Sequence, residues 1–180
     1  EPGRRIPDQA SLALVDSIDD RGVEWVPARK GARFEIDGIV ITALHPDTAW
    51  ARWGDDLNED SVVLRVTAGD FDAIFTGDAG LPVEAILAGQ TPADLLKVGH
   101  HGSRGATGDA WLRMLAPKVA VISVGAGNRY GHPAPETMAR LADARVPVWR
   151  TDLEGTVTVA VGSDSLEVRG RRGRERHSIR

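Results

Sequence analysis

The second half of the chain alternates short apolar runs with helical segments, and this pattern constrains the fold most. Continuous apolar runs of strand length occupy residues 94–99 and 118–125. Segments with helical spacing of their apolar residues follow at 108–116 and 134–144. Apolar runs without polar alternation are typical of strands that are buried on both faces. Strands interleaved with helices in this way predict a layered α/β domain.

The first half of the chain contributes two predicted β-hairpins. Asp37-Gly38 separates strand-like segments at 33–36 and 39–44, and this dipeptide strongly favours a tight hairpin turn. Gly69-Asp70 separates a second pair. The remaining predicted elements are a helix over 8–21 that ends at Gly22, strands at 23–26, 61–68, 71–77, 147–151 and 155–162, a helix at 82–89, and a strand at 165–169 that pairs back.

Composition limits the chemistry that this chain can carry. With 180 residues, the chain suits one domain, and no apolar run approaches the roughly 20 residues of a membrane span. The absence of cysteine excludes disulfide partners and thiolate metal sites. Any metal must therefore be bound by His, Asp, Glu or water, which favours Zn, Mn or Fe.

The charge of the chain is unevenly distributed. Residues 169–180 hold six arginines and one glutamate, whereas residues 1–168 carry a net charge of −9. We expect residues 169–180 to be a disordered basic tail, separate from a domain over 1–168. Such a tail can contact phosphates, or it can be a linker without a ligand.

Polar residues follow three of the predicted strands at the points where those strands end. These residues are Asp78, the group His100, His101 and Ser103, and the loop residues Asn128, Tyr130 and His132. In layered α/β folds, sites gather where strands end and loops begin, so these side chains can converge on one cleft.

The residues alone leave the role of each side chain open. Asp78 can bind one metal, bridge two, or be a turn residue or helix cap. Neighbouring residues on an extended chain point to opposite sides, so only one of His100 and His101 is expected to face a given metal. Ser103 can donate to a phosphate oxygen, and His132 can face a substrate or stabilise its own tight turn. A serine hydrolase is disfavoured because Ser103 lacks a nucleophile-elbow sequence.

Five phrases, in order and at suitable spacings, resemble one protein family. They are NEDSVVLRV, FTGDAG, LLKVGHHGS, AVISVGAGNRYGHP and WRTDLEGTVTV, and they span roughly residues 39–161 together with the segment before the first phrase. They are similar to the C-terminal metallo-β-lactamase-fold domain of bacterial DNA-internalisation competence proteins of the ComEC type. The resemblance implies an αββα sandwich, partial in this chain, with a site for two divalent metal ions, Zn or Mn, at its edge.

The same resemblance implies a function and a set of site residues. It implies hydrolysis of DNA phosphodiesters, with single-stranded DNA as the partner, by a water activated between two metals. The domain would lie beside a membrane channel domain of the same protein, on the exterior side of the membrane. Asp78 matches a metal ligand, and one of His100 and His101 matches another. His100 is favoured, and His101 would then support the metal or face the substrate. Ser103, Asn128, Tyr130 and His132 would bind the substrate.

The chain departs from the family pattern in one respect. The principal metal-binding signature of the fold, His-x-His-x-Asp-His, is absent, because no histidine precedes His45. Either the chain lacks the N-terminal part of the domain, which its start without Met favours, or this family member has lost the ligands and is not catalytic. Another alternative is a free-standing hydrolase of a different substrate.

This departure leads to two further expectations. Two protein ligands are fewer than the three usual in catalytic zinc sites. We therefore expect that this chain alone binds metal weakly and is not a competent nuclease, although the full-length protein would be an enzyme. An incomplete sandwich would also expose apolar sheet surface.

Overall fold

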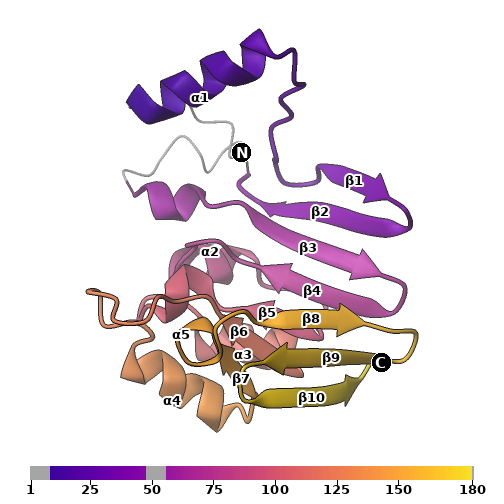
Figure 1. Ribbon diagram of the computed structural model, residues 1–180, viewed down its shortest axis with the longest axis vertical. Coiled ribbons are helices and arrows are strands. Elements are labelled where there is room, and N and C mark those ends of the chain that lie inside the picture. Colours follow the sequence, from indigo (N-terminus) through magenta and orange to yellow (C-terminus); the bar gives the residue numbers. More distant parts are fainter. Residues whose placement is uncertain (1–8, 48–55, 180) are drawn as a thin grey trace.

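The computed structural model describes residues 9–47 and 56–179, which form two β-sheets and a set of helices (Figure 1). Sheet A has seven strands in sequence order, β1 to β7. Its strands are β1 (Arg33–Ile36), β2 (Ile39–His45), β3 (Val63–Ala68), β4 (Phe71–Phe75), β5 (Leu95–Lys97), β6 (Val119–Ile122) and β7 (Val148–Arg150). Strands β1 to β4 pair antiparallel, and β4 to β7 pair parallel.

Sheet B is smaller and antiparallel, and it contains the last strands of the chain. Its order is β10-β9-β8, with β8 (Thr158–Val161), β9 (Ser165–Gly170) and β10 (Gly173–Ser178). The helices are α1 (Gln9–Asp20), α2 (Leu81–Ile86), α3 (Asp109–Leu115), α4 (Pro135–Asp143) and α5 (Thr151–Glu154), with short 3₁₀ turns η2 (Leu57–Asp60) and η3 (Gly99–Gly102).

Two apolar cores define the layers of the molecule. In the first core, Ile74 and Leu96 of sheet A pack in one cluster with Trp111 of α3 and Leu141 of α4. In the second core, residues of β4, β5 and β6 pack against buried Leu166 of sheet B. Alternate residues of each strand face these two cores, as the two-residue period of a strand requires. The resulting order of helices, sheet A and sheet B confirms the predicted layered α/β class and the metallo-β-lactamase-like architecture.

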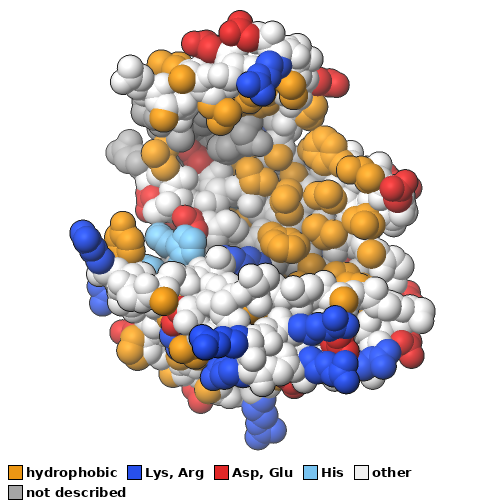
Figure 2. Space-filling view, viewed as in Figure 1, with side chains coloured by type: hydrophobic (Ala, Val, Ile, Leu, Met, Phe, Trp, Pro, Cys, Tyr) orange, Lys and Arg blue, Asp and Glu red, His pale blue; other side chains and the backbone are white. Residues whose placement is uncertain are grey.

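Sheet B covers only part of sheet A, as Figure 1 shows. Sheet A continues through β3 and β2 to β1, and apolar side chains on this part of the sheet are exposed to solvent. Ile36 is 62% exposed and Ile39 is 42% exposed. A wide apolar surface is visible there in Figure 2. This surface agrees with the expected exposure of apolar sheet residues.

The predicted hairpins are present. Asp37 and Gly38 both have positive φ, at 50° and 80°, so the turn between β1 and β2 has the left-handed backbone that this dipeptide favours. The helix predicted over 8–21 is α1, and the backbone N–H of Gly22 donates to Asp19 after its last turn. No residue of α1 is buried, so its apolar face packs weakly against the rest of the described chain.

Two predictions about local structure are wrong, one for residues 23–26 and one for residues 169–180. Residues 23–26 do not form a strand, and Val23 and Val26 are exposed without a ladder partner among the described residues. The strand predicted over 147–151, by contrast, is confirmed as β7 (Val148–Arg150), and α5 begins at Thr151. Residues 169–180 are not a disordered tail over their described part, because β9 extends to Gly170 and β10 pairs along it. A ladder of backbone hydrogen bonds, rather than side-chain burial, holds β10 in place, and composition does not reveal such a ladder.

Candidate functional site

The ends of β4, β5 and β6 meet at one edge of sheet A and bring the predicted site residues together. These three strands are parallel neighbours, so the loops that follow them lie side by side. The backbone N–H of His100, after β5, donates to the carbonyl of Gly77, after β4, at 3.0 Å. The ring of His101 contacts the carbonyl of Ser123, after β6, at 2.7 Å.

Asp78 contacts His101 directly. The Nε2 atom of His101 lies 3.5 Å from Oδ1 of Asp78, and both side chains are partly exposed, at 48% and 40%. The other ring nitrogen, Nδ1, lies at hydrogen-bond distance from the Ser123 carbonyl. A carbonyl accepting from one imidazole nitrogen orients the ring and leaves the other nitrogen free to bind a metal. The family resemblance favoured His100 as the second metal ligand, whereas His101 is the histidine that contacts Asp78 in the structure.

The backbone at the histidine pair is strained. His100 has φ 45° and ψ 47°, and His101 has φ 55° and ψ 21°, so both lie in the left-handed region. This region costs about 1–2 kcal/mol for a residue with a Cβ atom. The assumption that the pair lies on extended chain is therefore wrong, because β5 ends at Lys97 and a tight turn follows it. Strain of this kind persists where the surrounding structure fixes the backbone, which is common at functional sites.

Gly102 allows the histidine turn to close against the loop that carries His132. Its φ is +83°, and a Cβ atom at this position would lie 2.6 Å from Cβ of Pro133. The backbone N–H of Ala134 donates to the carbonyl of Gly102 at 2.8 Å. Any larger residue at Gly102 would therefore separate the two loops.

Ser61 holds the turn that carries Asp78. The backbone N–H of Asp78 donates to Oγ of Ser61 at 3.1 Å. Gly77 has φ +54°, and a Cβ atom there would lie 3.1 Å from Cβ of Ser61.

Nearby, burial lowers the pKa of Lys97, while the negative charge of Asp78 opposes that shift. The lysine and the carboxylate therefore interact at the same sheet edge.

Three imidazole rings gather beside this pair. The ring of His100 lies 6.3 Å from that of His101 and 5.9 Å from that of His132, measured between centroids. Burial, followed by the charges of the other two histidines, lowers the pKa of His132. Tyr130, which is almost fully exposed, stacks on His132 with ring centroids 6.0 Å apart. His132 is therefore biased toward its neutral form, in which one ring nitrogen can accept a proton.

A polar cavity of about 500 Å³ opens next to the imidazoles. Three of the residues expected to bind substrate line it, namely Ser103, Tyr130 and His132, together with Arg104 and the first residues of α4. Asn128 has a different role, because its side-chain amide is occupied within its own loop. It donates to the carbonyls of Gly125 and His132 and accepts from the backbone N–H groups of Tyr130 and His132. Asn128 thus shapes the loop that presents His132.

Two residues of α4 that sequence reasoning missed hold the loop after the histidines. The guanidinium of Arg140 donates to the carbonyls of Arg104, Ala106 and Thr107. The hydroxyl of Thr137 donates to the carbonyl of Ser103 at 2.8 Å. In a sequence, an arginine in the last turn of a helix cannot be told from an ordinary exposed residue. Only the contact of Arg140 with the loop carbonyls reveals its function.

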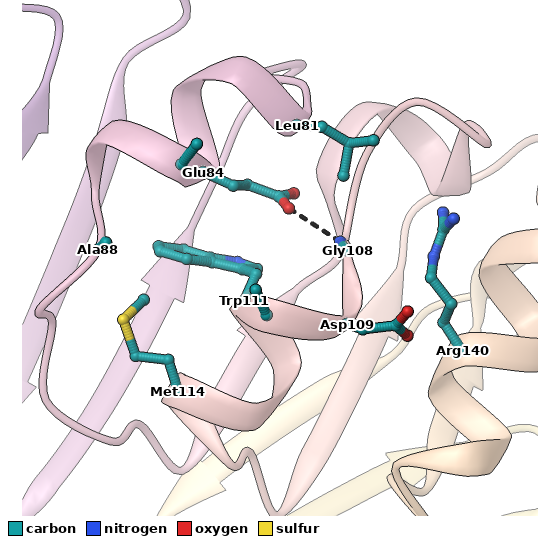
Figure 3. Close-up of a pocket in the computed structure, with 10 residues that line it drawn as sticks. Leu81, Glu84, Ala88, Gly108, Asp109, Trp111, Met114 and Arg140 are labelled. Carbon is teal, nitrogen blue, oxygen red and sulfur yellow. Dashed lines mark hydrogen bonds between the residues drawn. The ribbon is translucent and has the colours of Figure 1, made fainter.

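Glu84 of α2 supports the same loop from the other side and was also missed. Its carboxylate accepts hydrogen bonds from the backbone N–H groups of Thr107 and Gly108, and burial raises its pKa. Oγ1 of Thr107 in turn accepts from the N–H of Gly99, at the start of η3. Figure 3 shows Glu84 pointing at Gly108 beside a cavity of about 480 Å³ between α2 and α3. A glutamate within an apolar helical segment was the available signal for a buried carboxylate.

His45 has a structural role at the end of β2. It is buried, its Nε2 atom lies 2.7 Å from the carbonyl of Glu59, and burial lowers its pKa. The segment after His45 lies partly outside the described residues, and η2 follows it.

Asp78 and His101 are suitable donors for a divalent metal ion, because a carboxylate oxygen and an oriented imidazole nitrogen face each other. Within residues 9–47 and 56–179 there is no group of three or more His, Cys, Asp or Glu side chains arranged to hold an ion. The described residues therefore fit part of a metal site, with Asp78 and His101 as the two donors that face each other.

Comparison with known proteins places this edge of the sheet in a known superfamily. The family model described as the metallo-beta-lactamase superfamily matches residues 52–126, a range that includes Asp78, His100 and His101. A solved structure from Parabacteroides distasonis aligns with a TM-score of 0.48 and 13% identity, over 81% of this chain and 70% of that one.

Three curated relatives are similar over most of the chain. ComE operon protein 3 of Bacillus subtilis is 36% identical over 80% of this chain and 19% of that protein. Competence protein ComA of Neisseria gonorrhoeae is 32% identical over 75% of this chain and 20% of that protein. Recombination protein 2 of Haemophilus influenzae is 36% identical over 77% of this chain and 17% of that protein.

This chain spans about a fifth of the length of those relatives. In the part of the chain that the structure describes, no helix combines the length and the apolar character that crossing a bilayer requires. The matched segment carries the Asp78 and His101 pair at the end of a layered α/β fold. The chain belongs to the metallo-β-lactamase-fold domains of the ComEC-type competence proteins.

Proposed function

We propose that this domain is a metal-dependent hydrolase that cleaves DNA phosphodiesters during DNA uptake. The contact between Asp78 and His101 carries the proposal, because it pairs two metal donors at a sheet edge beside a polar cavity. The names of the relatives, which include a competence protein and a recombination protein, support DNA as the substrate. The proposal also includes a membrane channel domain of the same protein as the neighbour, with this domain on the exterior side.

Asp78 and His101 would hold a divalent metal, Zn or Mn, with further ligands from outside this pair. When bound, such an ion lowers the pKa of a coordinated water and stabilises negative charge on a phosphate. The Ser123 carbonyl keeps the His101 ring in the orientation that this role requires. Ser61 keeps the Asp78 carboxylate at the same edge.

The remaining residues of the site would act on the substrate. His132, whose pKa is lowered, stays neutral near pH 7 and is suited to accept a proton at a ring nitrogen. Ser103 and Arg104 line the cavity and supply a hydroxyl and a guanidinium, both of which can donate to phosphate oxygens. Tyr130 offers an exposed aromatic face on which a base of a single strand can stack.

The metal part of the proposal is tested by NMR on the chain itself. Paramagnetic Mn²⁺ is titrated into protein with labelled histidines, because broadening detects weak binding. The His101 imidazole signals are expected to broaden first, and Asp78→Ala is expected to abolish this effect. Asp109→Ala, which removes an exposed carboxylate on α3, is the matched control and should leave the broadening unchanged. Equal broadening in wild type and D78A would show that Asp78 does not bind the metal.

The substrate part is tested with labelled single-stranded DNA and with bis(p-nitrophenyl) phosphate in excess Mn²⁺. Because two donors hold the ion weakly and this chain alone is not expected to be a competent nuclease, only trace cleavage of DNA is expected, and D78A should lose it. Equal cleavage by wild type and D78A would exclude Asp78 from the mechanism. Hydrolysis of the small diester without DNA cleavage would favour a different substrate. Metal contact without hydrolysis of either compound would favour a non-catalytic role.

A further inference from the structure

Arginine is concentrated on the outward face of sheet B. Residues 165–178 hold five arginines and two glutamates, in a chain with a net charge of −4. Alternate residues of β9 are buried between the sheets, so Glu167 and Arg169 point outward. The strand register places Arg174 opposite Arg169 and Arg176 opposite Glu167, on the same side. We call Arg169, Arg174 and Arg176 the arginine face.

Positive charge on the arginine face exceeds what its neighbours neutralise. Arg169 and Arg174 lie directly across from each other, and opposed like charges destabilise a strand pair. Glu167 pairs with Arg169, and the hydrogen bond from Arg169 together with the nearby arginine charges lowers its pKa. Among the described residues, Arg174 makes no side-chain hydrogen bond or ion pair. The Glu167 carboxylate thus lies among three guanidinium groups at the centre of the face.

Arg172 shows how a structural arginine of the same segment differs. Its guanidinium pairs with Glu154 of α5, whose carboxylate is buried, and its backbone N–H donates to the same carboxylate at 3.0 Å. This contact fastens the turn between β9 and β10 to the domain. Arg176, by contrast, donates from Nε and Nη2 to the neutral hydroxyl of Ser165, at 2.9 and 2.7 Å, and lies 3.9 Å from the exposed carboxylate of Asp164. No residue of the arginine face has a buried carboxylate as its partner in the described chain, so this charge is available to a ligand.

We propose that the arginine face binds the phosphate backbone of a nucleic-acid strand. Planar guanidinium groups form paired hydrogen bonds with phosphate oxygens. Residues two apart on a strand are spaced about 6.6–6.8 Å, so Arg174 and Arg176 present a row of donors to an extended anionic chain. The adjoining outward residues of β8 are Thr158 and Ala160, which offer none of the large apolar anchors that surface-bound membrane segments use. These features favour a phosphate backbone over a lipid surface.

The position of the arginine face suits the proposed hydrolase. Figure 2 shows basic side chains gathered over sheet B and histidine side chains on the same side of the molecule. A strand bound along sheet B would therefore remain on the side of the molecule where the histidines are visible. Only the identity of this strand as a substrate rests on the proposed function, since phosphate binding by arginine needs no metal.

The experiment measures binding of a fluorescent single-stranded oligonucleotide by anisotropy, in EDTA, at salt concentrations from about 50 to 200 mM, a range over which phosphate contacts change affinity strongly. The test variant is R169Q/R174Q/R176Q, and circular dichroism checks that it folds. The matched control is R21Q/R113Q/R145Q, which removes three exposed arginines from elsewhere. Loss of three phosphate contacts is expected to reduce the slope of log K against log salt by about 2, because each contact on single strands contributes about 0.7. The control variant should bind like wild type.

Three outcomes would overturn the proposal. One is an unchanged salt slope in the folded test variant, and a second is an equal loss in both triple variants. The third is a test variant that still binds the oligonucleotide but no longer binds vesicles of anionic phospholipid, which would show that the arginine face binds a membrane. Asp78→Ala is expected to bind the oligonucleotide normally in EDTA. Failure of the proposed hydrolase function would therefore leave the binding result intact, and the two failures are distinguishable.

Discussion

Nε2 of His101 lies 3.5 Å from Oδ1 of Asp78, while the opposite nitrogen of the same ring faces the Ser123 carbonyl at 2.7 Å. Three consecutive parallel strands are therefore connected through one imidazole. The first supplies the carboxylate, the second supplies the histidine, and the third supplies the carbonyl that orients it. Because the ring is partly exposed, changes to it should separate metal binding from folding.

His101→Gln is expected to weaken Mn²⁺ or Zn²⁺ binding by at least about tenfold, because even loss of an orienting partner costs about 10–100-fold in metal affinity. His100→Gln is the matched control, since it removes a neighbouring imidazole of equal size. Isothermal titration of each variant with metal measures the difference. A larger loss of metal affinity in H100Q than in H101Q would identify His100, rather than His101, as the ligand. Tight binding of two ions by the wild-type chain would contradict the view that it supplies two donors.

Gly102→Ala is expected to destabilise the domain by about 1–3 kcal/mol, because overpacking a closed contact costs that much. The new Cβ atom would lie 2.6 Å from Cβ of Pro133, at a backbone φ of +83° that disfavours alanine. Gly125→Ala is the control, because a Cβ atom there would meet no atom within 4 Å and this glycine lacks a positive φ. Urea unfolding measures both variants. Similar midpoints for the two would argue against the close approach of the loops.

Glu84→Gln is expected to remove a specific pH dependence of stability. Burial raises the folded-state pKa of Glu84 above its ordinary value of 4.5, so the folded protein holds this proton more tightly than the unfolded chain. The stability from this linkage is fully present below pH 4.5 and is lost as pH rises through the folded-state pKa. Urea unfolding from about pH 4 to about pH 8 measures the free energy of unfolding of wild type and of E84Q. The excess stability of wild type over E84Q should shrink as pH rises.

Two further features make the Glu84 experiment decisive. Glu136→Gln changes an exposed carboxylate on α4 and should leave the pH profile of stability unchanged. E84Q should also be less stable than wild type by about 1–3 kcal/mol near neutral pH, because an amide cannot accept from both backbone N–H groups. Parallel profiles for wild type and E84Q would show that Glu84 does not titrate with an altered pKa in the folded state.

Arg172→Gln is expected to destabilise the domain most at neutral pH, whereas the stability linked to Glu84 is largest at low pH. The hydrogen bond from Arg172 holds the pKa of Glu154 below its ordinary value of 4.5. The stability contributed by this ionised carboxylate is therefore present above pH 4.5 and is lost as pH falls through its folded-state pKa. Unfolding near pH 7 should show a deficit in R172Q that narrows toward about pH 3. Arg174→Gln, which removes an arginine without an ion pair among the described residues, should show no such deficit.

The sequence by itself determined much of this fold. Uninterrupted apolar runs at 94–99 and 118–125 predicted buried strands, and both are central in sheet A. Asp37-Gly38 predicted a turn that only residues tolerant of positive φ form readily, and both residues adopt it. Local preferences such as these depend on a few neighbouring residues, so they can be read without knowledge of the rest of the chain.

Tertiary structure alone decided which side chains meet. The two histidines are equivalent in sequence, but the left-handed turn after Lys97 directs His101 toward Asp78. The arginines of residues 169–180 read as a disordered tail, because a strand stabilised by backbone pairing leaves little trace in composition. Such choices depend on contacts between residues far apart in the chain, and the sequence specifies these contacts only through the folded whole.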